Sequence, residues 1–143
     1  MDNINVYSAL QDLQLSAERY MRNNITDSNI TDEAGSNGWI IKYIFSSKRA
    51  VYQRDLEKEF GINRSSASKS VDALVERGLV IREHIPEDGR LKKLTLTEKG
   101  QKIAEQFAAR ESCADKALTN GFSISDKKLL ASLIGRMKIN LSK

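Results

Sequence analysis

The sequence predicts a mainly helical chain that carries one small β-hairpin. Apolar residues recur every three or four positions through most of the 143 residues, which is the spacing of amphipathic helices. Two short segments rich in Val, Ile, Leu and Thr flank a run with strong turn chemistry, which indicates a hairpin. A chain of this length is sized for one domain, 1–143, with an apolar core of its own.

Composition excludes several classes of protein. The apolar runs, such as 39–41 and 43–45, are far shorter than the roughly 20 residues that a membrane span needs. The first residues lack the basic and apolar regions of a signal peptide. The single cysteine, Cys113, has no partner for a disulfide within the chain, as is usual in a reducing compartment. We therefore expect a cytoplasmic protein without a membrane partner.

Helices with apolar stripes are predicted at both ends of the chain. The first covers 4–22, another begins after Thr97 and runs to about Leu118, and the last begins at Ser125 with Ile124 and Leu129 packed around its cap. These stripes are too wide for the small central core to cover. We therefore expect 1–24 and 101–143 to form a helical dimerisation region, with packing on the same chain as the alternative.

Between them, two helices are predicted on either side of a tight turn. Segment 23–38 is expected to be a loop, in which Thr31 to Glu33 offers an alternative helix start, and a helix at 39–46 follows. Helices at 52–60 and 64–77 are then separated by a glycine turn. Asn63 is a good cap for the second of them, and Gly78 suits the left-handed residue that ends it.

A hairpin follows the second helix at once. Strands are predicted at 79–85 and 91–96, joined by the five-residue turn 86–90. Two helices joined by a tight turn and followed by a basic hairpin form a winged helix-turn-helix, which we assign to 39–100. Residues 48–102 hold 13 Lys and Arg against 9 Asp and Glu, whereas the rest of the chain holds 10 of each. The positive excess therefore coincides with this region and favours a polyanionic partner.

Helical phase separates the two faces of 64–77. Apolar residues point toward the core: Ala67, Val71, Leu74 and Val75. Ser65, Ser66 and Lys69 point outward in the first two turns, the part of a recognition helix that meets base edges. Ser68 lies at the flank, and Arg64 is expected to contact phosphate at the edge. On the hairpin, Arg90 is expected at a minor groove or phosphate, with Asp88 holding its guanidinium and Lys92 adding charge.

These motifs resemble the multiple antibiotic resistance regulator (MarR) family. The resembling residues are Tyr52 to Leu56, Asn63 to Leu74, Glu76 to Val80, Asp88-Gly89-Arg90 and Leu96-Thr97-Glu98-Lys99-Gly100. About half of the chain matches by motif, and the helices at both ends match by layout.

The resemblance implies a homodimer bound to double-stranded DNA with a pseudo-palindromic operator. It implies the serines and Lys69 in the major groove, Arg90 at the tip of the wing and Asp88 beside it. Lys69 stands where the family often has arginine, so two-pronged recognition of guanine is in doubt. Gln53, at the start of the preceding helix, is a candidate phosphate contact. A repressor released by a small-molecule effector is the regulatory mode expected.

Other interpretations remain open. Trp39 and Tyr43, at helical spacing, are core residues or the lining of a pocket for a small aromatic effector. Cys113 is expected to be a packed small hydrophobe, with oxidation sensing as the alternative. His84 has no ligand cluster around it, so neither a metal nor a cofactor is expected. The sequence contains neither a glycine-rich phosphate loop nor a nucleophile with a plausible base, so it does not indicate an enzyme. The rival function is a winged helix used for protein interaction, which predicts acidic or apolar residues where the serines, Lys69 and Arg90 stand.

Overall fold

A computed structural model describes residues 3–24 and 33–143, which divide into two compact units. One unit combines 1–24 with 111–143, and the other spans 25–110. Helix α6 (Glu98–Leu118) contributes its first half to the second unit and its remainder to the first. The predicted helix start at Thr31 and residues 25–32 of the predicted loop at 23–38 lie outside the described residues. In the described part of that loop the prediction is wrong, because 23–24 end α1 and 35–37 form a short 3-10 helix. No helix of the described ranges is both long and apolar enough to cross a membrane.

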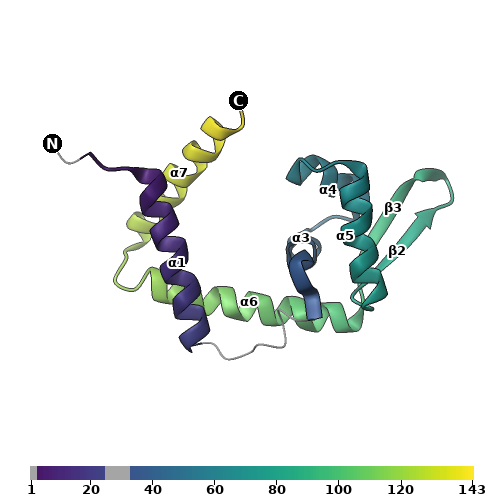
Figure 1. Ribbon diagram of the computed structural model, residues 1–143, viewed down its shortest axis with the longest axis horizontal. Helices are drawn as coiled ribbons and strands as arrows, with labels where there is room; N and C mark the ends of the chain where they lie inside the picture. The colour runs from purple at the N-terminus through teal and green to yellow at the C-terminus, as the bar shows by residue number, and fades with distance from the viewer. Residues whose placement is uncertain (1–2, 25–32) are drawn as a thin grey trace. The chain divides into compact units, whose positions relative to one another are not determined.

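The unit 25–110 holds the predicted winged helix-turn-helix (Figure 1). Its elements follow one another in the order given by the sequence. They are η1 (Gly35–Asn37), α3 (Gly38–Ser46), β1 (Val51–Tyr52), α4 (Gln53–Phe60), α5 (Arg64–Glu76), β2 (Val80–Ile85), β3 (Asp88–Leu96) and the first half of α6. The mainly helical fold with a small β-hairpin is therefore confirmed, and the hairpin of β2 and β3 is called the wing below.

The sheet has three antiparallel strands in the order β1-β3-β2, one strand more than the predicted hairpin. The added strand, β1, pairs Val51 with Leu94 and Tyr52 with Lys93. The turn of the wing is also shorter than expected, because Ile85 already pairs with Asp88 and only Pro86 and Glu87 lie between the strands. Segment 88–90 therefore begins β3, and the predicted five-residue turn is wrong. The register of the two strands shifts between His84, which pairs with Lys92, and Ile85.

The core of this unit is formed where α3, α4 and α5 meet the sheet. Its largest fully buried side chains are Ile40, Ile41, Leu56, Val71, Leu74, Leu79 and Leu94. Helix α5 contributes Ala67, Val71 and Leu74, as its phase predicted. Val75 was predicted to face inward as well, but it is 36% exposed because it lies in the last turn of α5, beyond the end of the core.

The other unit contains α1 (Val6–Asn24), the end of α6 and α7 (Ile124–Leu141). Helix α7 begins earlier than predicted. Ser123 is its cap, accepting from the backbone N–H of Asp126 at 3.0 Å while the Asp126 carboxylate accepts from the N–H of Ser123 at 2.9 Å. The reciprocal cap replaces the predicted start at Ser125 and the packing of Ile124 around it, since Ile124 is 75% exposed.

A junction at the base of the wing closes the unit 25–110. The Thr97 hydroxyl donates to the carbonyl oxygen of Gly78 at 2.6 Å and accepts from the N–H of Gly100 at 3.0 Å. The N–H of Thr97 donates to the carbonyl oxygen of Leu79 at 3.1 Å. A Cβ at Gly100 would collide with that same Leu79 carbonyl, so this close approach of backbone to backbone requires glycine.

We expect Gly100→Ala to lower the free energy of unfolding by about 1–3 kcal/mol, the usual range for forcing extra volume into a packed site. The methyl group must displace the Leu79 backbone, to which Thr97 is bonded. Chemical denaturation measures the change. Gly135→Ala is the matched control, because Gly135 lies within α7 with no atom near its absent Cβ. That control should gain roughly 0.5–1 kcal/mol from helix propensity, and an equal loss in both variants would contradict the packing argument.

Candidate nucleic-acid interface

Local capping sets the direction of α5, which carries the predicted recognition residues. Gly61 ends α4 in the left-handed region with φ +61°. Asn63 then caps α5, with its side-chain oxygen accepting from the N–H of Ser66 at 2.8 Å. Both ends of the turn are therefore specified by residues that the sequence had singled out.

The outward side of α5 has the predicted composition. Ser65, Ser66 and Lys69 are exposed, and these three residues are called the reading face below. Arg64 is exposed beside them, and Ser68 is half-buried at the flank. Small hydroxyl groups permit close approach, and the Lys69 ammonium donates hydrogen bonds without accepting any. The reading face can therefore donate to acceptors on base edges or phosphates.

The wing places its charged residues along β3 instead of at a turn. Asp88 and Arg90 are exposed, and Lys92 is half-buried opposite His84. The Asp88 carboxylate accepts from the backbone N–H of Arg90 at 3.0 Å. Asp88 therefore stabilises the start of β3. The predicted contact between Asp88 and the Arg90 guanidinium is not formed in the described part of the chain. The Arg90 side chain is left unpaired there and exposed.

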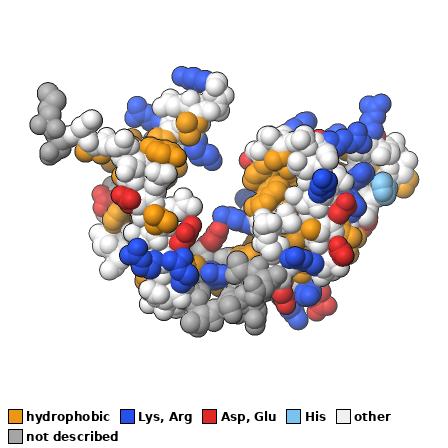
Figure 2. All heavy atoms as spheres, in the orientation of Figure 1, with side chains coloured by type: hydrophobic (Ala, Val, Ile, Leu, Met, Phe, Trp, Pro, Cys, Tyr) orange, Lys and Arg blue, Asp and Glu red, His pale blue; other side chains and the backbone are white. Residues whose placement is uncertain are grey.

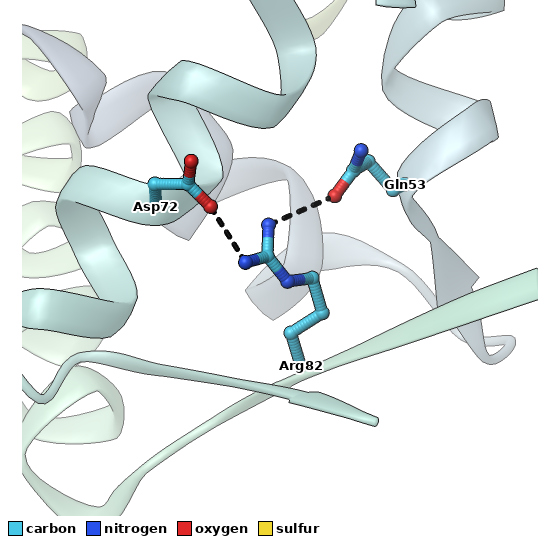
Figure 3. Close-up of polar contacts among 3 residues, drawn as sticks. All are labelled: Gln53, Asp72 and Arg82. Atoms are coloured by element: carbon cyan, nitrogen blue, oxygen red, sulfur yellow. Dashed lines mark hydrogen bonds and ion pairs between the residues drawn. The ribbon is translucent and has the colours of Figure 1, made fainter. Parts of the chain in front are cut away.

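A polar network links the three elements that surround the reading face (Figure 3). Arg82 on β2 lies between Asp72 of α5 and Gln53 of α4. One guanidinium nitrogen of Arg82 lies 2.6 Å from the Asp72 carboxylate, and another donates to the Gln53 side-chain oxygen at 3.3 Å. The planar guanidinium therefore bridges the recognition helix, the preceding helix and the wing.

The network changes how two residues are interpreted. Gln53 is only 4% exposed, so the side chain predicted to contact phosphate contacts Arg82 instead, and its phosphate role gains no support here. Asp72, which lies on α5 beyond the reading face, has its charge balanced by Arg82. Arg82 itself was missed. Its one sequence signal is a charged residue in an otherwise apolar strand start, four residues after the glycine that ends α5.

Two further predictions concern residues away from this surface. Trp39 and Tyr43 are half-buried against the core and pack edge-on against Phe60, with ring centroids 4.5 and 5.5 Å apart. They belong to the core packing, and a role in an effector pocket stays a prediction. Cys113 is exposed, so its predicted packing is wrong. In this part of α6 the neighbouring Ala114 is the half-buried residue. Oxidation sensing stays a hypothesis.

A family model described as "MarR family" matches residues 43–91, from the end of α3 to the wing. This stretch contains α4, α5 and the Asp-Gly-Arg of β3. The winged helix-turn-helix region therefore resembles the MarR family over this stretch. The resemblance inferred from the sequence is thereby confirmed.

Comparison with known proteins extends the likeness to the whole fold. The "Uncharacterized HTH-type transcriptional regulator YdgJ" of Bacillus subtilis (strain 168) is 26% identical over 92 residues, which are 64% of this chain and 56% of that protein. The matched part thus spans just over half of the relative's length. A putative MarR-family transcriptional regulator from Listeria monocytogenes, complexed with 26mer DNA, has a TM-score of 0.74 at 20% identity, covering 99% of this chain and 90% of that one.

A third comparison is with a structure that holds a ligand. The PcaV transcriptional regulator from Streptomyces coelicolor, in complex with its natural ligand, has a TM-score of 0.68 at 18% identity. The match covers 96% of this chain and 97% of that chain. At these identities the solved structures establish a shared MarR-like fold, including helices at both ends.

We expect Arg82→Ala to destabilise the chain more than Asp72→Ala. Removing Arg82 leaves the buried oxygen of Gln53 without its donor, and an unsatisfied buried acceptor costs about 1–3 kcal/mol. Asp72 is 56% exposed, so its removal should cost less than about 1 kcal/mol, as for other surface ion pairs. Denaturant unfolding of both variants and the double variant measures this. Equal costs for the two single variants would show that water replaces Arg82 at Gln53.

Proposed function

We propose that this chain is a dimeric, sequence-specific DNA-binding transcriptional regulator that acts in the cytoplasm. The observation that carries the proposal is the pairing of an exposed, hydroxyl-rich reading face with an exposed Arg90 on the wing, within a region that matches the MarR family. Helix α5 would enter a major groove with Ser65, Ser66 and Lys69 toward base edges, and Arg90 would reach the adjacent minor groove. Arg64, Ser68 and Lys92 would contact the backbone.

The fold relative from Listeria monocytogenes supports DNA as the partner, since it was solved with a 26mer DNA. The rival proposal is a winged helix that binds proteins. It predicts acidic or apolar side chains on the outward side of α5, whereas the reading face carries hydroxyl groups and an ammonium. Figure 2 shows Lys and Arg side chains gathered over the part of this unit that holds α5 and the wing. A polyanion fits this surface better than an apolar protein partner.

The terminal helices support a homodimer. Neither α1 nor α7 has a buried residue within the single chain. The exposed apolar side chains of this unit include Leu10, Leu13, Tyr20, Leu118, Phe122, Leu129, Leu130, Leu133 and Ile134, and Figure 2 shows hydrophobic side chains on its visible surface. Monomeric proteins rarely expose apolar patches of this extent. A second copy would cover them and present two reading faces to a pseudo-palindromic operator, with half-sites about one helical turn apart.

We further propose that the regulator is a repressor released by a small aromatic effector. The PcaV regulator, which shares the fold, was solved with its natural ligand. A ligand that binds one arrangement of the dimer better than another would shift the separation of the two reading faces. DNA affinity would then fall without any change in the reading face itself.

The DNA proposal is tested with Arg90→Ala in fluorescence-anisotropy titrations of labelled duplexes. Wild-type affinity should fall steeply as salt rises, because phosphate neutralisation releases counterions. The variant should bind about tenfold more weakly, equivalent to about 1.4 kcal/mol, with an unchanged melting temperature. Arg136→Ala, which removes an arginine from α7 in the other unit, is the control and should bind as wild type. Absent or salt-insensitive binding by the wild type would reject the DNA proposal.

The dimer is tested by placing charge on the apolar side of α7. Leu129→Glu/Leu133→Glu should convert a dimer to a folded monomer at micromolar concentration, because both side chains are exposed in the single chain and need no internal repacking. Sedimentation velocity gives the mass, and circular dichroism checks folding. Lys128→Glu/Ser132→Glu on the same helix adds the same side chains at polar positions and should stay dimeric. A monomeric wild type would contradict the proposal.

A further inference from the structure

The unit 25–110 contains a second basic surface, formed by residues other than those assigned to DNA so far. A hollow of about 520 Å³ lies between the end of α3 and the start of α4. We call it the basic hollow, and its lining residues are Tyr43, Ser47, Lys48, Arg49, Ala50, Val51, Tyr52, Arg54 and Asp55. Three of the nine are cations and one is an anion.

The one carboxylate in the lining is already engaged. Asp55 accepts from the backbone N–H of Tyr52 at 2.8 Å, which holds the first turn of α4. Lys48, Arg49 and Arg54 are exposed, and in the described ranges none of them forms an ion pair. Arg54 lies over the ring of Tyr52, with its guanidinium carbon 5.7 Å from the ring centre. With three cations and one carboxylate in its lining, the basic hollow carries a net positive charge, and Tyr52 helps to orient part of it.

The walls of the basic hollow connect to both elements proposed to read DNA. Tyr52 pairs with Lys93 on β3, the strand that also carries Arg90, while Glu83 stands on the other side of Lys93. The residue after Tyr52 is Gln53, which is linked through Arg82 to Asp72 of α5. A partner that reaches the hollow is therefore adjacent to β3. It also lies next to Gln53, which the Arg82 network connects to α5.

We propose that the basic hollow is a third DNA contact, which receives the phosphate backbone beyond the segment read by α5 and the wing. This inference rests on the DNA-binding function proposed above. Sites for small ligands are mostly apolar and enclose most of the ligand, whereas four of the nine residues in this lining are charged and three of those are exposed cations. Long, exposed cations suit a polyanion that passes across the opening, and they contribute affinity that does not depend on sequence.

The test uses Lys48→Ala/Arg49→Ala in the full chain, with duplexes of random sequence in the same anisotropy assay. The slope of log affinity against log salt should become shallower by about 0.9 for each phosphate that the variant no longer neutralises. The fall in affinity should be the same for every duplex sequence, because backbone contacts carry no base information. The melting temperature should not change. Lys127→Ala/Lys128→Ala on α7 removes the same charge elsewhere and should leave the slope unaltered.

Failure of this proposal is distinguishable from failure of the DNA function. Wild-type binding combined with an unchanged slope in Lys48→Ala/Arg49→Ala would overturn the third contact alone. A small anion is tested by adding inorganic phosphate at matched ionic strength and following the melting temperature. A saturable rise in the wild type that is abolished in the variant, together with an unchanged DNA slope, would assign the hollow to a small anion and overturn the proposal.

Discussion

The winged helix-turn-helix depends on a short contact between backbone segments at the base of the wing. Thr97 binds the carbonyl groups of Gly78 and Leu79 and caps α6 through the N–H of Gly100, so the end of α5, the end of the wing and the start of α6 are joined at one point. Leu79 and Gly100 are buried, so their backbone groups would otherwise lose these hydrogen bonds on folding. The absence of a side chain at Gly100 makes the approach possible.

From this junction the position of the reading face follows. The core residues of α5 face inward from its first turn onward, which leaves Ser65, Ser66 and Lys69 on the outward side of the helix. Arg82 then connects α5 and α4 to the wing at their polar edge. An arginine suits this position because its rigid, planar guanidinium donates hydrogen bonds in two fixed directions. The ammonium of a lysine is a point charge whose donors rotate freely. Apolar packing sets the height of α5 over the sheet, and the arginine adds directional contacts at its rim.

Features that rest on local chemistry were predictable from the sequence. The caps Asn63 and Thr97 and the stop at Gly78 act within a few residues, so the bounds of α5 and the start of α6 were found closely. The same local reasoning identified the outward residues of α5. For α7 the predicted start at Ser125 was wrong, because Ser123 forms the reciprocal cap with Asp126.

Features that rest on contacts between distant residues were missed. Strand β1 has two residues, and only its pairing with β3, far along the chain, makes it a strand. The bridge from Arg82 to Gln53 spans 29 positions and leaves no periodic trace. The exposure of Cys113 and Val75 depends on where along the helix its packing against other elements ends. Helical periodicity in the sequence does not give that position. The candidate site was therefore predictable on α5, and its supporting network was not.

In the proposed regulator, the two units would divide the requirements of recognition between them. One reading face and one wing would supply few contacts to bases, and the exposed cations around them would bind any sequence of phosphates equally well. Two such surfaces held at a fixed separation make the second contact intramolecular, which multiplies affinity only for sites with matching half-site spacing. The apolar sides of α1 and α7 have no role in the chemistry of the reading face. In the proposed dimer they would convert two weak, charge-dominated surfaces into one that discriminates operator geometry.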